Sequence, residues 1–216
     1  MIRSPSRLAN LILPGLVFVA AVQPAAAQRL GPEPSEPAHV QILARFSTCI
    51  AHRSPRRAEH LLAMDYRTDA YQRDLRRLAT GNSGCLGRGM LRFSAVLFAG
   101  GMAETLMRER GLLTDLASRV ALDPARAPFA ARDGIELMSI CVVRAAPVGV
   151  ATLLQTAPAS EAETAALQAL TPRLADCLGA GEQLRVNRIA LRSLLALAAW
   201  HLGAHNGWAR SGPAAG

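Results

Sequence analysis

Residues 47–89 read STCIAHRSPRRAEHLLAMDYRTDAYQRDLRRLATGNSGCLGRG. When the numbering is shifted by 92, residues 139–181 lie over them as SICVVRAAPVGVATLLQTAPASEAETAALQALTPRLADCLGAG, and twelve of the 43 positions are identical. The identical positions include both cysteines, a proline and two glycines, which an abundance of Leu and Ala alone does not explain. The pattern predicts a tandem duplication of one folding unit.

Apolar residues recur at helical spacing in both copies. From Val40 to Ile50 they repeat at three and four positions, which is typical of a helix with one buried face. Ser54-Pro55 predicts the start of the next helix, with the serine as N-cap. Asp69 predicts the cap of a third helix, which the turn 81–84 closes. No strand alternation of convincing length occurs, so the predicted fold is all-α: a duplicated, disulfide-stapled multi-helix unit packed as one helical domain.

Each copy ends in a long helix, predicted over about 91–110 and 181–202. Gly100-Gly101 in the first of these costs about 1 kcal/mol per glycine relative to Ala, which indicates close approach of another helix. Arg192 lies beside the apolar stripe of the second. We expect the chain to turn at 172–178 before that second helix.

The first residues are typical of a secretory signal peptide. Arg3 and Arg7 precede an apolar stretch at 11–22 that is too short to span a bilayer, and Ala25-Ala26-Ala27 provides a cleavage site. We therefore expect a periplasmic or secreted protein without a transmembrane segment in the mature chain. The expected divisions are a signal peptide (1–27), a loose N-terminus (28–36), helical copy 1 (37–110), a connection (111–134), helical copy 2 (135–203) and a disordered tail (204–216).

Four cysteines allow three disulfide pairings. The separation within each copy is 36 residues, which favours Cys49 with Cys85 and Cys141 with Cys177. The alternative is a metal site that adds His52 to the first pair. It is disfavoured because the second copy has arginine at the matching position and no Cys-x-x-Cys occurs. We expect no metal and no cofactor.

Sequence motifs of common enzymes are absent from the chain. There is no Gly-x-Ser-x-Gly, no His-Glu-x-x-His and no phosphate-binding loop. The carboxylates that could act as a general acid or base have arginines three or four residues away. Charge pairing on the surface therefore explains them without a catalytic role. A non-enzymatic protein is therefore expected.

Basic residues are unusual in kind and in distribution. All 24 are Arg, which genomic composition bias or selection for bidentate anion binding would explain. Seven basic positions of the first copy are not shared by the second: Arg53, Arg56, Arg57, His60, Arg73, Arg76 and Arg77. They predict either an anion-binding face or a merely solvated one.

Predicted export and these basic positions indicate which kinds of molecule the protein binds. We expect a structural or protein-binding role in the periplasm, with an unknown protein partner in the envelope. The alternative is binding of anionic lipid or lipopolysaccharide by the arginine face. Nucleic acid is disfavoured because no aromatic residues interleave with the arginines.

Residues 40–202 share a sequence pattern with a group of other proteins. It consists of a cysteine with a proline six residues on, a Leu-Leu pair, Cys-Leu-x-x-Gly, and the run Ala103-Glu104-Thr105-Leu106 in a long helix. This pattern resembles uncharacterised small secreted helical proteins of sphingomonad-type bacteria, a group with no assigned activity. The resemblance implies the repeat and export, and no chemistry. Because the second copy lacks Glu104, that residue is expected to be dispensable for the fold unit.

Overall fold

The computed structural model describes residues 36–87, 93–178 and 187–208. Within these ranges the chain forms helices and connecting turns without any strand, which confirms the all-α prediction for them. The elements are α1 (Glu36–Arg53), α2 (Pro55–Ala63), α3 (Asp69–Gly81), the 3₁₀ helix η1 (Ser83–Cys85), α4 (Ala95–Glu109), α5 (Leu116–Val120), α6 (Gly134–Ala145), α7 (Pro147–Gln155), α8 (Glu161–Asp176) and α9 (Arg188–His205).

The helices of the two halves follow the same shift of 92 residues. Adding 92 to the bounds of α2 gives those of α7, and adding 92 to the last residue of α1 gives the last residue of α6. The first residues of α3 and α8 are related in the same way. Helix order is therefore the same in both halves, with α4 and α9 as the corresponding long helices.

Each half contains one disulfide. Cys49 of α1 is bonded to Cys85 of η1, and Cys141 of α6 is bonded to Cys177, which follows α8. The paired Cα atoms are 5.7 Å apart in both bridges. The predicted pairing is confirmed. Disulfides are typical of proteins that fold outside the reducing cytosol.

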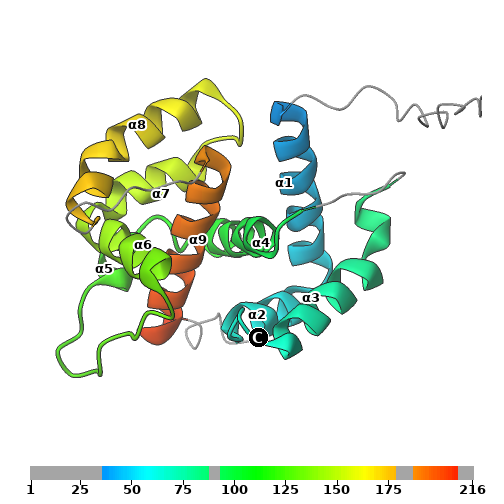
Figure 1. The fold of residues 1–216 in the computed structure, drawn as a ribbon, viewed down its shortest axis with the longest axis horizontal. Helices are drawn as coiled ribbons and strands as arrows, with labels where there is room; N and C mark the ends of the chain where they lie inside the picture. The colour runs from blue at the N-terminus through cyan, green and yellow to red at the C-terminus, as the bar shows by residue number, and fades with distance from the viewer. Residues whose placement is uncertain (1–35, 88–92, 179–186, 209–216) are drawn as a thin grey trace, which may run out of the picture. The chain divides into compact units, whose positions relative to one another are not determined.

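The long helices α4 and α9 pack against each other between α1–α3 on one side and α5–α8 on the other (Figure 1). Helix α4 also packs against α1, and α9 against α6. Both central helices are rich in core residues, among them the fully buried Phe98, Met102 and Leu195. Because such burial is the main favourable contribution to folding, these two helices hold the halves together.

Gly100 and Gly101 lie where α4 approaches two different helices. A Cβ on Gly100 would lie 2.5 Å from the Cβ of Ser193 in α9, and one on Gly101 would lie 2.7 Å from the Cβ of Ser47 in α1. Real Cβ atoms do not approach other atoms so closely, so each helix pair needs glycine at its contact. The predicted close approach is confirmed.

One predicted helix cap is wrong, and a second occupies the N-cap position without making the capping hydrogen bond. Thr68, rather than Asp69, caps α3, because its backbone is extended and its Oγ1 accepts the N–H of Tyr71 at 3.2 Å. Ser54 precedes α2 as expected, but its backbone lacks the extended cap conformation. Its hydroxyl instead donates to Oδ1 of Asn82 at 3.3 Å, and so links α2 to the end of α3.

Pro172 does not end α8, contrary to the expected turn at 172–178. The helix continues through it to Asp176. Proline cannot donate an N–H to the carbonyl four residues earlier, that of Gln168, but both residues lie on the exposed side of the helix. The helix therefore tolerates the proline near its C-terminus and ends one residue before the disulfide at Cys177.

The chain beyond Ala204 is ordered further than expected. Helix α9 extends to His205, and Trp208 is buried. The indole ring fills the space beside Gly203, where an added Cβ would lie 2.2 Å from it. This corrects the expectation of a disordered tail for its first residues, while residues 209–216 lie outside the described part.

The predicted signal peptide (1–27) lies outside the described residues, as does nearly all of the expected loose N-terminus (28–36). None of the described helices is by itself long and apolar enough to cross a membrane. Helices α6 and α7 together reach the required length and composition, but the pair is bent by 100°.

Candidate functional site

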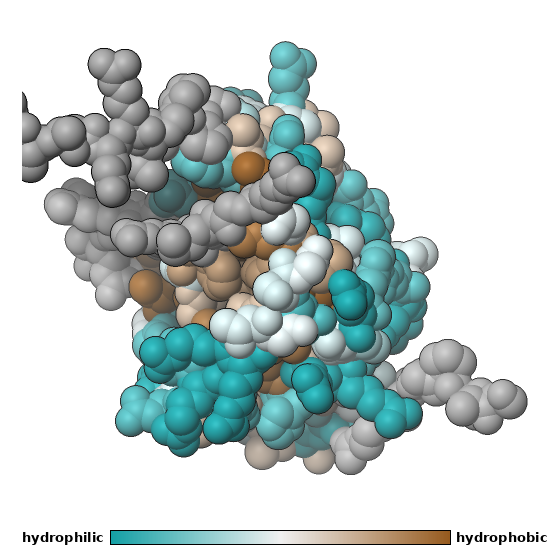
Figure 2. Space-filling model, turned by 90° about the vertical axis from the view of Figure 1, so that its right-hand side faces the viewer, coloured by the Kyte–Doolittle hydropathy of each residue, from teal (hydrophilic) through white to brown (hydrophobic). Residues whose placement is uncertain are grey.

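The seven basic side chains singled out in the sequence are all exposed, at the end of α1 and on α2 and α3. We call this set the basic surface: Arg53, Arg56, Arg57, His60, Arg73, Arg76 and Arg77. Helices α2 and α3 pack against each other, which brings the two groups of arginines close. Figure 2 shows hydrophilic surface gathered along the lower edge of the face that it presents, the level at which Figure 1 places these helices.

Few carboxylates neutralise the basic surface. Asp74 lies 3.3 Å from NH1 of Arg77 and 4.0 Å from Nε2 of His60. Glu59 of α2 is instead paired with Arg110, at the end of α4. Five arginines of the basic surface have no carboxylate within ion-pair distance in the described part of the chain: Arg53, Arg56, Arg57, Arg73 and Arg76. The basic surface therefore carries uncompensated positive charge.

The structure brings some members of the basic surface together and separates another. Arg57, His60 and Arg77 surround Asp74 in a surface depression of about 310 Å³. Arg53 does not line this depression. It lies beside Gly84 and lines a larger cavity.

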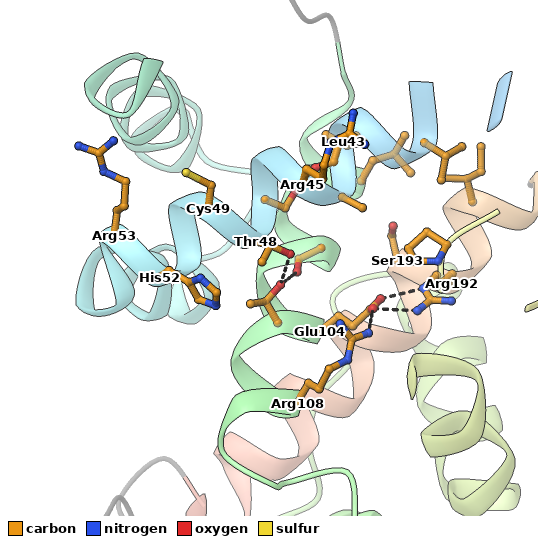
Figure 3. A pocket seen from close by; sticks show the side chains of 18 residues that line it. Leu43, Arg45, Thr48, Cys49, His52, Arg53, Glu104, Arg108, Arg192 and Ser193 are labelled. Atoms are coloured by element: carbon orange, nitrogen blue, oxygen red, sulfur yellow. Dashed lines mark hydrogen bonds and ion pairs between the residues drawn. The ribbon is translucent and has the colours of Figure 1, made fainter. Parts of the chain in front are cut away.

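That larger cavity, of about 490 Å³, lies between α1, α4 and α9 (Figure 3). We call it the α1–α4–α9 cavity. Its apolar wall includes Val40 and Leu43 of α1, Leu97 of α4 and Ile189 of α9, and four arginines and Glu104 also line it. Sites for small molecules are commonly clefts of about 300–1,000 Å³ with a few convergent polar groups. This cavity fits that description.

Arg192 of α9 joins the two halves at the base of this cavity. Its Nε and NH2 donate to the two carboxylate oxygens of Glu104 at 2.8 and 2.7 Å, and NH1 donates to Glu163 of α8 at 2.9 Å. The hydroxyl and the carbonyl of Thr156 accept the two remaining N–H groups at 2.9 and 2.8 Å. All five guanidinium N–H groups are therefore hydrogen-bonded.

The charges in this network are buried and matched. The Arg192 side chain is 5% exposed, and that of Glu163 is 1% exposed. Burial lowers the pKa of the Arg192 guanidinium, but its bonds to Glu104 and its attraction to both carboxylates outweigh burial and hold the pKa above its ordinary value. Arg108 of α4 also pairs with Glu104.

Sequence reasoning missed this network. Glu104 was expected to be dispensable, whereas it connects α4 to α9, the corresponding helix of the other half. The available signal was a carboxylate in the middle of a largely apolar run, from Phe98 to Met107. Such a residue is seldom buried without a partner. The identity of that partner, 88 residues away, was not readable from the run itself.

A second cavity, of about 330 Å³, lies between α2, α3, α4, α6 and α9. We call it the His201 cavity. Most of its wall is apolar, including Leu61 of α2 and Leu197 of α9. Its polar end is formed by four side chains: Tyr66, Asp133, Glu136 and His201.

The polar end of the His201 cavity is internally hydrogen-bonded. Nδ1 of His201 lies 2.9 Å from Oε1 of Glu136, and Nε2 lies 3.1 Å from the carbonyl of Leu62. Burial raises the pKa of Glu136, but the bonds from His201 and Arg132 outweigh it, so the pKa lies below its ordinary value.

Asp133 accepts a hydrogen bond from the hydroxyl of Tyr66. Burial raises the pKa of Asp133, but this bond and bonds from backbone N–H groups outweigh it and lower the pKa overall. Burial and the neighbouring Asp133 raise the pKa of Tyr66. At neutral pH the carboxylate is therefore ionised and the tyrosine is protonated.

The two cavities occupy corresponding places in the two halves. Ser47 and Pro158, which line the first, correspond through the shift of 92 to Ser139 and Tyr66, which line the second. Each cavity lies between the first and last helices of one half and also contacts the last helix and a loop of the other half, while α2 and α3 line the second cavity alone. The polar groups in the two cavities differ, so the corresponding places are chemically distinct.

The structure also bears on metal binding. Cys49 and Cys85 are bonded to each other, and His52 is paired with Glu109 of α4, so the alternative of a metal site at these residues does not hold. In the described ranges there is no group of three or more His, Cys, Asp or Glu side chains placed to hold a metal ion.

Comparison of the chain with protein-family models, with curated proteins and with solved structures found no match. The resemblance to small secreted helical proteins stays a prediction. Function is therefore argued from the basic surface and the two cavities.

Proposed function

We propose that this protein is exported to the periplasm and acts there as a non-enzymatic binding protein. In this proposal its two halves arose by tandem duplication of a disulfide-stapled helical unit, and the basic surface of the first half binds an acidic protein partner. The proposal rests mainly on the uncompensated arginines of α2 and α3. Charged residues without partners attract and orient a partner of opposite charge.

Comparison of the two halves supports a binding role for these arginines. At the positions of Arg56, Arg57 and Arg76 the second half has Val148, Gly149 and Gln168. Helices α7 and α8 form without these charges at the positions that correspond to α2 and α3. The arginines are therefore not needed to build the unit.

A protein partner is favoured over a lipid surface by the residues around the basic surface. Helices that bind the surface of a membrane place large apolar side chains beside their basic ones, so that these enter the lipid. In the described residues the exposed large apolar side chains are Leu122, Ile135, Leu137 and Val148, and none of them lies on α2 or α3.

The test is a pulldown from intact periplasm with the purified protein as bait. The variant Arg56→Gln/Arg57→Gln/Arg76→Gln removes three positive charges from the basic surface. The control Arg126→Gln/Arg173→Gln/Arg188→Gln removes the same charge from other exposed positions. We expect a specific acidic protein to be retained by the native protein and the control, and to be lost with the first variant.

Binding to vesicles of phosphatidylglycerol or to lipopolysaccharide is measured in parallel over a salt titration. Lipid binding that falls steeply with salt and depends on the three arginines would favour the lipid alternative over the protein partner. Equal retention of the partner by both variants would also contradict the proposal. Circular dichroism should show the same helical signal for both, because neither set of arginines is buried.

Export has a separate test. The disulfides and the charged, apolar and small-residue segments of residues 1–27 support it. Mass spectrometry of the protein from the periplasmic fraction should give a chain that begins at Gln28. An intact chain that begins at Met1 and stays in the cytoplasm would contradict export.

A further inference from the structure

The α1–α4–α9 cavity is positively charged. Four arginines line it: Arg45, Arg53, Arg108 and Arg192. Glu104 is the single carboxylate among its described lining residues, but Glu163 pairs with Arg192 and Glu109 with His52, so four arginines and three carboxylates leave a formal charge of +1 when His52 is neutral. A cavity with apolar walls and charge of one sign concentrates ligands of the opposite sign. The cavity therefore favours an anion.

Arg108 has hydrogen-bond donors to spare inside this cavity. Its NH2 pairs with Glu104 and donates to the carbonyl of Leu154 at 2.6 Å. Its Nε and NH1 have no acceptor among the described residues, and the side chain is 44% exposed. A guanidinium has five N–H groups, so three remain for a ligand. Figure 3 shows Arg108 reaching from α4 toward Glu104 at the base of the cavity.

Ser193 supplies a second polar group. It is 7% exposed, its hydroxyl has no hydrogen-bond partner in the described part of the chain, and it lines the cavity. Figure 3 places it on α9, on the side that faces α1. The oxygen itself is not fully buried, so the hydroxyl can donate to an acceptor bound in the cavity.

The remaining wall is apolar. Val40 and Leu43 of α1 are buried, and Leu97 of α4 lies with them along the cavity. A fully charged or polar ligand would leave these side chains without contact. A ligand that matches the whole cavity therefore has an anionic head and an aliphatic body.

We propose that the α1–α4–α9 cavity binds an amphipathic aliphatic carboxylate. Its carboxylate accepts one N–H group that is left free on Arg108 and the hydroxyl of Ser193, and its chain lies against the apolar wall. NH2 of Arg108 takes part in both forks of a guanidinium and is occupied by Glu104 and Leu154, so the contact from Arg108 is a single charge-assisted hydrogen bond. Of the basic surface, only Arg53 lines this cavity, and the proposed contacts do not use it.

The test uses decanoate as probe with the purified, oxidised protein in isothermal titration calorimetry. Two further probes separate the contribution of the carboxylate head from that of the aliphatic chain. Acetate has the same head without a chain, and decylammonium has the same chain with a positive head. We expect saturable binding of decanoate and binding at least about tenfold weaker for the other two, because each lacks one of the two interactions. Equal affinity for decanoate and decylammonium would overturn the proposal.

Two variants locate the site. Arg108→Gln should weaken decanoate binding about tenfold, because a charge-assisted hydrogen bond is lost while Gln still reaches Glu104. Ala44→Trp, which fills the cavity from α1, should abolish binding. Ile135→Trp, in the His201 cavity, is its control and should keep the native affinity.

The basic-surface variant Arg56→Gln/Arg57→Gln/Arg76→Gln should also keep the native affinity for decanoate, so this test and the test of the protein partner succeed or fail separately. Absence of saturable decanoate binding to the native protein, or unchanged affinity in both Arg108→Gln and Ala44→Trp, would overturn the proposal. The circular dichroism signal of each variant verifies that it is folded.

Discussion

Arg192 of α9 and Glu104 of α4 form a two-point ion pair, with nitrogen–oxygen distances of 2.8 and 2.7 Å, across the contact between the two halves. Helices α4 and α9 correspond to each other through the shift of 92, but the positions that match Arg192 and Glu104 are Gly100 and Ala196. The pair therefore occurs on one side of the contact, and glycine replaces the arginine on the other. The two halves therefore have the same order of helices, but the contact between their central helices, α4 and α9, is not symmetric.

Replacing Glu104 should destabilise the fold strongly. Glu104→Ala leaves Arg192 buried with two of its donors unpaired, and loss of one partner of a buried pair costs about 3–5 kcal/mol. The free energy of unfolding is measured by urea denaturation. Glu109→Ala is the control on the same helix, because Glu109 is 40% exposed, and it should cost about 1 kcal/mol or less. Similar losses in the two variants would contradict the structural role of the ion pair.

Stability should depend on pH through Glu136. In the folded protein its pKa lies below the ordinary value of 4.5, so the ionised group stabilises the fold above pH 4.5. That contribution is lost as the pH falls from 4.5 through the lowered pKa. We expect the free energy of unfolding of native protein to decrease over this window, and to decrease less in Glu136→Gln. Glu161→Gln, at an exposed position of α8, should keep the native slope. Equal slopes for all three proteins would count against this assignment.

Each disulfide should stabilise its own half. The variants Cys49→Ser/Cys85→Ser and Cys141→Ser/Cys177→Ser each open a loop with a sequence separation of 36. The chain-entropy model gives a loss of roughly 4 kcal/mol for each. Because the bridges are in different halves, the two losses should add within about 0.5 kcal/mol in the variant that lacks both. Non-reducing peptide mapping that recovers Cys49 linked to Cys141 would contradict the pairing.

Alanine at Gly100 should destabilise the protein although alanine favours helices. The new Cβ would lie 2.5 Å from the Cβ of Ser193 and 2.6 Å from its Cα, so α4 and α9 would have to separate. Overpacking of this kind costs about 1–3 kcal/mol or more. Gly81→Ala, at the end of α3, meets nothing within 4 Å and should be neutral or slightly stabilising. Thermal denaturation compares the two, and a Gly100→Ala protein as stable as the native one would refute the close contact.

Much of the fold was readable from the sequence because the signals were local. Apolar spacing, prolines and glycines marked the helices. Where the prediction was wrong, exposure or packing in the folded protein decided the outcome. Pro172 lies in an exposed part of α8 that tolerates it, and Trp208 is ordered by packing beside Gly203. Residue type alone does not indicate either environment.

The sequence by itself determined the all-α class, the order of helices in the two halves and the disulfide pairing, because periodicity and equal cysteine spacing are properties of the chain alone. Only the tertiary structure decided which charges are buried and which cavities form. The reason is physical: a buried charge requires a partner, and the partner of Glu104 is 88 residues away on a helix that reaches it only after α4 and α9 have packed. The basic surface was visible in the sequence, whereas the cavity beside Arg108 exists only between helices of both halves.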